Sequence, residues 1–168
     1  ERCNLTCGFC WQDHSDWSGI DDVVKKADIV VASTVPGTHY SVNVMGGELF
    51  MDEVPDRILD DYFAFCEVID QKVDSYCVNF VSNLVFEKTE RVVKLFERLE
   101  EKGIHFTVCT SYDPKGRFNT ETLKVFQRNL PIFNKWLSNI SVVLTKPNME
   151  FFLKHGTEDK VFKDLYEK

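Results

Sequence analysis

Long apolar runs, an excess of basic residues and low-complexity stretches are all missing from this sequence. The longest apolar run, around residues 29–32, is far below the ~18–20 residues that a membrane-spanning helix needs. The net charge of −7 does not indicate a nucleic-acid-binding face. No signal peptide, linker or close repeat is visible. We therefore expect a cytoplasmic protein that stays out of the membrane, with residues 1–168 folded as a single domain.

Six cysteines are present, but their distribution does not suit a disulfide framework. A chain with 43% hydrophobic residues and 14 Phe can build a core without covalent staples. Cys3, Cys7 and Cys10 crowd into the pattern Cys-x3-Cys-x2-Cys, which suits a metal centre better. No second close set of cysteines exists for an auxiliary cluster. The remaining three are expected to be core thiols, namely Cys66, Cys77 and Cys109.

Closely spaced thiolates from one loop can converge on one metal centre. Three protein ligands on a four-iron cluster leave one iron free for an exogenous ligand, so such a site can react as well as transfer electrons. Two other uses of the loop stay open. A structural zinc site needs a fourth ligand, for which His14 is the nearby candidate. A simple iron–sulfur electron carrier normally has a fourth cysteine, and none lies close.

Helical and extended patterns alternate along the rest of the chain. We expect strands at 40–45, 76–82, 104–110 and 140–145, and helices at 20–32, 55–70, 89–102, 120–129, 149–155 and 158–168. Pro131 is expected to end or kink the helix before it. This alternation predicts βαβ units and a parallel sheet. Ligands bind at the carboxyl end of such sheets, so the residues after each strand are candidate site residues.

Paired glycines follow the first expected strand, in the segment Met45-Gly46-Gly47-Glu48-Leu49. Without a Cβ atom, their backbone lets a ligand approach closely. The Glu48 carboxylate can accept hydrogen bonds from an ammonium group. A simple turn is the alternative interpretation.

The cysteine loop resembles the signature of the radical S-adenosylmethionine (SAM) family. Cys3, Cys7 and Cys10, with Phe9 directly before the third cysteine, match its three cysteines and one aromatic residue. Residues 2–10 are also similar to the cluster loop of viperin-like members. The resemblance implies that the thiolates bind three irons of a [4Fe–4S] cluster. It further implies that SAM chelates the fourth iron and that Phe9 packs near the cluster and the adenine.

Three later segments resemble further motifs of the family, in the family's order. Gly46, Gly47 and Glu48 resemble its Gly-Gly-Glu-Pro motif, which binds the SAM amino group, although leucine replaces the proline. Ser82 and Asn83 resemble its Ser-Asn-Gly strand end, with leucine where the glycine stands.

The third of these segments, Thr110-Ser111-Tyr112-Asp113, resembles the family's Ser-x-Asp segment. This likeness implies that Ser111 approaches the SAM carboxylate or ribose, although an Asx turn is another explanation for Asp113. Thr145, which ends the last expected strand, is a candidate on the adenosine side. The loop 114–118 carries Lys115 and Arg117, which could meet an anionic substrate group. A solvated surface loop is the favoured interpretation of that run.

The resemblance implies a partial TIM-like (β/α) barrel of parallel strands that lacks its first strand, within a longer protein. The implied reaction begins with one electron from a flavodoxin- or ferredoxin-like donor. SAM is then cleaved to methionine and a 5′-deoxyadenosyl radical, which abstracts hydrogen from a peptide, protein, nucleotide or base. No side chain is assigned as acid or base. An inactive, truncated barrel that only binds its ligands stays open as an alternative.

Overall fold

The computed structural model describes residues 2–11, 22–156, 158–161 and 163. These residues form a mixed α/β structure with one all-parallel sheet, in the strand order β1-β2-β3-β4. The strands are β1 (Tyr40–Val44), β2 (Tyr76–Val81), β3 (Phe106–Ser111) and β4 (Leu137–Ser141). The helices are α1 (Val23–Ala32), α2 (Asp56–Lys72), α3 (Thr89–Glu101), α4 (Thr120–Phe133) and α5 (Lys146–His155). None of the described helices is long and apolar enough to cross a bilayer.

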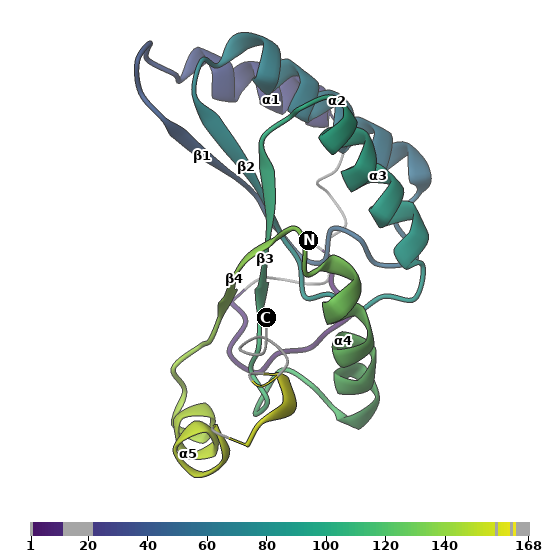
Figure 1. Ribbon diagram of the computed structural model, residues 1–168, viewed down its shortest axis with the longest axis vertical. Helices are drawn as coiled ribbons and strands as arrows, with labels where there is room; N and C mark the ends of the chain where they lie inside the picture. Colours follow the sequence, from purple (N-terminus) through teal and green to yellow (C-terminus); the bar gives the residue numbers. More distant parts are fainter. Residues whose placement is uncertain (1, 12–21, 157, 162, 164–168) are drawn as a thin grey trace.

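The helices α1 to α4 gather on one side of the sheet, and α5 lies near the end of β4 (Figure 1). Tyr76, Val78 and Phe80 of β2 are buried, whereas Cys77 and Asn79 between them are only half-buried. This alternation follows from the two-residue period of a strand. It gives the sheet one apolar face beneath the helices and one polar face.

Asn79 joins three strands across the polar face. Its side-chain nitrogen donates to Ser41 Oγ at 2.6 Å and to Asn43 Oδ1 at 3.1 Å. Its side-chain oxygen accepts from Thr107 Oγ1 at 2.6 Å. The polar side chains of β1, β2 and β3 on this face therefore satisfy one another.

Phe96 of α3 lies at the centre of the core. Its ring centroid is 5.6 Å from that of Phe50, 5.7 Å from Phe80, 5.2 Å from Phe106 and 5.1 Å from Trp136. Phe96 is fully buried, because its position on the apolar stripe of α3 turns it toward the sheet. Val92, Leu95 and Leu99 of the same stripe are buried as well.

The three isolated cysteines divide between the core and the polar face of the sheet. Cys66 is buried in α2, as expected, and burial raises the pKa of its thiol to about 12. Cys77 and Cys109 are only half-buried, so the expected core position is wrong for both. Each alternates with buried neighbours along its strand, which places it on the polar face.

Two predicted boundaries are wrong near the end of the chain. Helix α4 continues past Pro131 to Phe133, because the proline falls in the last turn, where buried Leu130 and Phe133 hold the helix to the core. Strand β4 ends at Ser141, well before the expected end at 145. The backbone N–H of Val143 donates to a side chain outside the sheet, so the ladder stops. The other elements lie within a few residues of their predicted places, and most of 158–168 is outside the described residues.

Candidate functional site

The cysteine loop, residues 2–11, is anchored at the carboxyl end of the sheet. Leu5 is buried in the core, with 4% of its surface exposed. The side chain of Asn4 donates to the carbonyl oxygen of Val85, just beyond β2. Within the loop, Cys10 N donates to Cys7 O at 3.0 Å and forms a turn. The loop is thus fixed at one end by apolar burial and by a contact to the second strand end.

The Cys3 sulfur lies among hydrogen-bond donors. The backbone N–H of Leu5 is 3.5 Å from Sγ, and the side-chain nitrogen of Asn83 is 3.7 Å from it. Burial raises the pKa of the Cys3 thiol, and these two donors oppose the rise. N–H groups directed at sulfur are a feature of sites that hold thiolates on iron–sulfur clusters.

The glycine loop, residues 45–48, packs directly on the cysteine loop. The backbone N–H of Glu48 donates to Arg2 O at 3.0 Å. Gly47 has φ 51°, and a Cβ atom on it would lie 2.0 Å from the same Arg2 oxygen. Gly46 has φ 135°, also in the region that favours glycine. The backbone conformation of residue 47 and the lack of space beside it therefore both require glycine. The contact also brings the two predicted motifs together.

Glu48 is buried between the ends of β1 and β2, with only 3% of its surface exposed. Its Oε1 accepts from Ser82 Oγ at 2.7 Å and from Phe50 N at 3.2 Å, and its Oε2 accepts from Asn83 N at 2.6 Å. Burial raises the pKa of Glu48 to about 7, against these hydrogen bonds. Three of roughly four lone-pair sites on the carboxylate are occupied, so it is held rigidly and retains capacity for one further donor.

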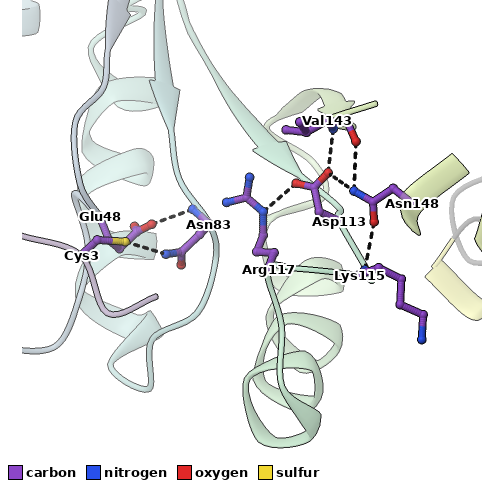
Figure 2. A network of polar contacts seen from close by, with 8 residues as sticks. All are labelled: Cys3, Glu48, Asn83, Asp113, Lys115, Arg117, Val143 and Asn148. Atoms are coloured by element: carbon purple, nitrogen blue, oxygen red, sulfur yellow. Dashed lines mark hydrogen bonds and ion pairs between the residues drawn. The ribbon is translucent and has the colours of Figure 1, made fainter. Parts of the chain in front are cut away.

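Asn83 connects three parts of the site, and Figure 2 shows it beside Cys3 and Glu48. Its Nδ2 donates to Asn4 Oδ1 at 2.9 Å, and its Oδ1 accepts from Val85 N at 2.7 Å. Ser82 and Asn83, the predicted pair at the second strand end, are therefore in direct contact with both loops.

The residue after this pair, Leu84, adopts φ 57° and is fully buried. This is a left-handed backbone, which a glycine would adopt freely. The backbone N–H of Leu84 donates to Ser82 Oγ at 3.1 Å. The chain thus turns at this position although the residue is not glycine.

Asp113 forms a second buried centre after β3. Its Oδ2 accepts from Arg117 Nε at 2.8 Å, and its Oδ1 accepts from Val143 N at 2.6 Å and from Asn148 Nδ2 at 3.1 Å. The Asn148 side chain also accepts from Lys115 N at 2.9 Å (Figure 2). Asp113 therefore joins the loop after β3 to the start of α5. An Asx turn would involve only neighbouring residues, so it does not account for these contacts.

Arg117, for which the sequence favoured a solvated surface loop, lies at the site. Its side chain is 14% exposed, so the favoured solvated loop is wrong for Arg117, although Lys115 is exposed as expected. Its Cζ lies 5.3 Å from the ring centroid of Phe9. Burial raises the pKa of the Cys7 thiol, and the Arg117 guanidinium opposes that rise. The one sequence signal was a pair of cations directly after a strand end.

The remaining predicted residues lie at the margins. Ser111 is the last residue of β3 and is half-buried. Thr145 does not end a strand, because it caps the N-terminus of α5 and its Oγ1 accepts from Asn148 N at 3.3 Å. Cys10 is exposed, whereas Cys7 is half-buried. Asn148, by contrast, could not be predicted from the sequence, because its role depends on a contact with Asp113, 35 positions away.

Within the ranges that the structure describes, no three His, Cys, Asp or Glu side chains are grouped so that they could hold a metal ion. Thiolates of a four-iron cube each bind a different iron, so they stand farther apart than the ligands of a single ion. The donor chemistry suits such a cluster: three thiols on one loop, with amide donors directed at Cys3.

No protein-family model matches the sequence, and a search of curated proteins finds no match. The case for a function therefore depends on the residues of the two loops and on the contacts between them.

Proposed function

We propose that the chain forms the core of a radical SAM enzyme, with Cys3, Cys7 and Cys10 as ligands of a [4Fe–4S] cluster. The observation that carries the proposal is the direct contact between the two motif-bearing loops. Glu48 N donates to Arg2 O at 3.0 Å, next to the first cysteine. A cluster on the cysteine loop and a cofactor on the glycine loop would thus be neighbours.

The backbone and side chains around the thiols are suited to hold negative charge. A cluster bound by three thiolates carries negative charge on its sulfurs, which N–H donors stabilise. Leu5 N and Asn83 Nδ2 supply such donors to Cys3. Because Leu5 is buried and Asn83 is fixed by two further hydrogen bonds, neither donor has to reorganise when the cluster binds.

Glu48 is the proposed acceptor for the SAM ammonium group. Its carboxylate is fixed by Ser82, Phe50 and Asn83, which leaves capacity for one more hydrogen bond. A bound ammonium would also favour the charged carboxylate, which burial disfavours. Gly47 lets the glycine loop pack directly on the cysteine loop, and Phe9 of the cysteine loop lies beside Arg117.

When bound, the cluster and SAM would supply one-electron cleavage of the sulfonium to methionine and a 5′-deoxyadenosyl radical. The chain's own contribution is to orient the cofactors and to keep water from the site. We place this site in a partial (β/α) barrel, since the described strands are parallel and its residues follow β1, β2 and β3. A flavodoxin- or ferredoxin-like protein is the proposed electron donor.

Anaerobic reconstitution with iron and sulfide tests the proposal. We expect about four irons per chain, by analogy with other cubane sites. Addition of dithionite and SAM should then release 5′-deoxyadenosine, detected by chromatography and mass spectrometry. Cys7→Ser should lose the cluster and the nucleoside.

Cys109→Ser is the matched control, because Cys109 is equally half-buried but lies on the sheet, away from the cysteine loop. It should keep both iron and product. Zinc retained after purification with no iron uptake would contradict the proposal and favour a zinc site. Iron uptake without nucleoside would favour a barrel that binds but does not react.

A further inference from the structure

Arg117 is fixed in one orientation by a buried carboxylate. Its Nε donates to Asp113 Oδ2 at 2.8 Å, and Asp113 has no exposed surface. Asp113 is itself fixed by Val143 N and Asn148 Nδ2. Because the guanidinium is planar and permanently charged, fixing Nε also fixes the direction of its other two nitrogens.

The same loop contacts the cysteine loop at two adjacent points. Gly8 N donates to Gly116 O at 3.4 Å. The Arg117 Cζ lies 5.3 Å from the Phe9 ring centroid, within the range of a cation–π contact. Gly116 has φ 104°, and a Cβ atom there would lie 3.7 Å from the Phe9 ring. The segment between Cys7 and Cys10 therefore lies against the loop that follows β3.

The charge of Arg117 lies beside the cysteine loop. Its Cζ stands over the ring of Phe9, a residue between Cys7 and Cys10 in the sequence. Figure 2 shows Arg117 on the side of Asp113 that faces Asn83, Cys3 and Glu48. A buried cation in this place stabilises added negative charge nearby more than an exposed one would.

We propose that Arg117 is a positioning residue that clamps the cysteine loop to the end of β3 and raises the reduction potential of the cluster held there. The inference rests on the proposed function and adds to it a control of cluster potential. Reduction would add one negative charge to the cluster, and a fixed cation beside the segment between Cys7 and Cys10 would favour that state. The Asp113 contact keeps the cation in place, and the Phe9 contact fixes the loop against it.

Spectroscopic redox titration of the reconstituted chain tests the effect of the charge. We expect Arg117→Gln to shift the ratio of reduced to oxidised cluster about tenfold toward the oxidised form at a fixed potential. That change corresponds to about 59 mV for a one-electron couple. Arg117→Lys keeps the charge and should restore most of the potential. The control Lys115→Gln removes the same net charge from an exposed neighbour and should leave the potential unchanged.

Arg117→Gln leaves Asp113 buried without its cation, which could unfold the chain. The double variant Asp113→Asn/Arg117→Gln removes both charges and should fold. It should lower the potential less than the single variant does, because loss of the Asp113 carboxylate partly offsets loss of the cation. Unchanged potentials in both variants would overturn the inference. An equal fall in Lys115→Gln would also overturn it, because net charge alone would then explain the shift.

Hydrogen exchange of the chain without iron tests the clamp independently of the cluster. We expect amides in residues 3–10 to exchange about tenfold faster in the double variant, and no faster in Lys115→Gln. Equal exchange in all variants would overturn the clamp. If the parent chain takes up no iron, the proposed function fails, and exchange alone then decides whether Arg117 positions the loop.

Discussion

The carbonyl oxygen of Arg2 occupies the space where a Cβ atom of Gly47 would stand, at 2.0 Å from that position. Real Cβ atoms do not approach a backbone oxygen so closely. The cysteine loop and the glycine loop are therefore in contact only because residue 47 has no side chain.

Gly47→Ala should separate the two loops. The alanine meets both the Arg2 backbone and an unfavourable φ of 51°, so we expect a loss of about 2–4 kcal/mol in the free energy of unfolding, measured with urea. Gly37→Ala is the control, because Gly37 has φ 79° with nothing within 4 Å of the added Cβ. It should cost only about 1 kcal/mol, from backbone strain. Equal losses in the two variants would contradict the packing described for the loops.

The buried carboxyl of Glu48 should make stability depend on pH. Its pKa is about 7 in the folded chain and 4.5 as the ordinary value, so the folded state holds the proton more tightly. Its contribution is complete below pH 4.5 and is lost as the pH rises to about 7. The free energy of unfolding should fall over this interval by up to about 3 kcal/mol.

Glu48→Gln should abolish that fall, as measured by urea unfolding of the iron-free chain at several pH values. Ser82→Ala removes a hydrogen bond that lowers the pKa of Glu48, so it should extend the fall to higher pH. A Glu48→Gln variant with the parent's pH dependence would show that another group is responsible.

At position 84, a glycine variant should be more stable than an alanine variant, which is the reverse of the usual order. The φ of 57° at Leu84 favours glycine, whereas the buried leucine side chain is lost in both variants. We expect the free energy of unfolding to be about 1 kcal/mol higher for Leu84→Gly than for Leu84→Ala, so that Leu84→Gly unfolds at a higher urea concentration. The opposite order would indicate that the backbone relaxes out of the left-handed region when the leucine is removed.

Phe96 should be among the most sensitive core positions. Phe96→Ala removes a fully buried ring that contacts aromatic side chains from β2, β3 and the segments beside them, so we expect a loss of about 3–5 kcal/mol. Phe151→Ala, at a half-buried ring on α5, should cost clearly less. Similar losses at both positions would show that the core is not centred on Phe96.

The periodicity of the sequence predicted most of the fold, because strands and helices bury different sets of positions. Val78 and Phe80 are buried two positions apart, as a strand requires. Val92, Phe96 and Leu99 are buried three or four positions apart, as a helix requires. Pro131 and the end of β4 were misjudged for a different reason. The apolar anchoring of the last turn of α4 and the diversion of Val143 to Asp113 are contacts between distant segments, which local patterns do not contain.

The contacts of the candidate site likewise include some that the sequence could predict and some that it could not. The proximity of Glu48 and Asn83 could be anticipated, since the carboxyl ends of neighbouring parallel strands meet at one edge of the sheet. The burial of Arg117 could not be anticipated. It depends on Asp113 and Phe9 both reaching it, and Phe9 belongs to a loop more than a hundred positions away in the sequence.

The three-way bonding of Asp113 also sets an order of assembly during synthesis. Val143 follows Asp113 by 30 positions and Asn148 by 35, so both partners leave the ribosome well after it. The junction that fixes Arg117 is therefore completed late, whereas Cys3, Cys7 and Cys10 precede all of these residues. The three thiols are therefore synthesised long before the contact that holds Arg117 against their loop, and they are open to oxidation during that interval.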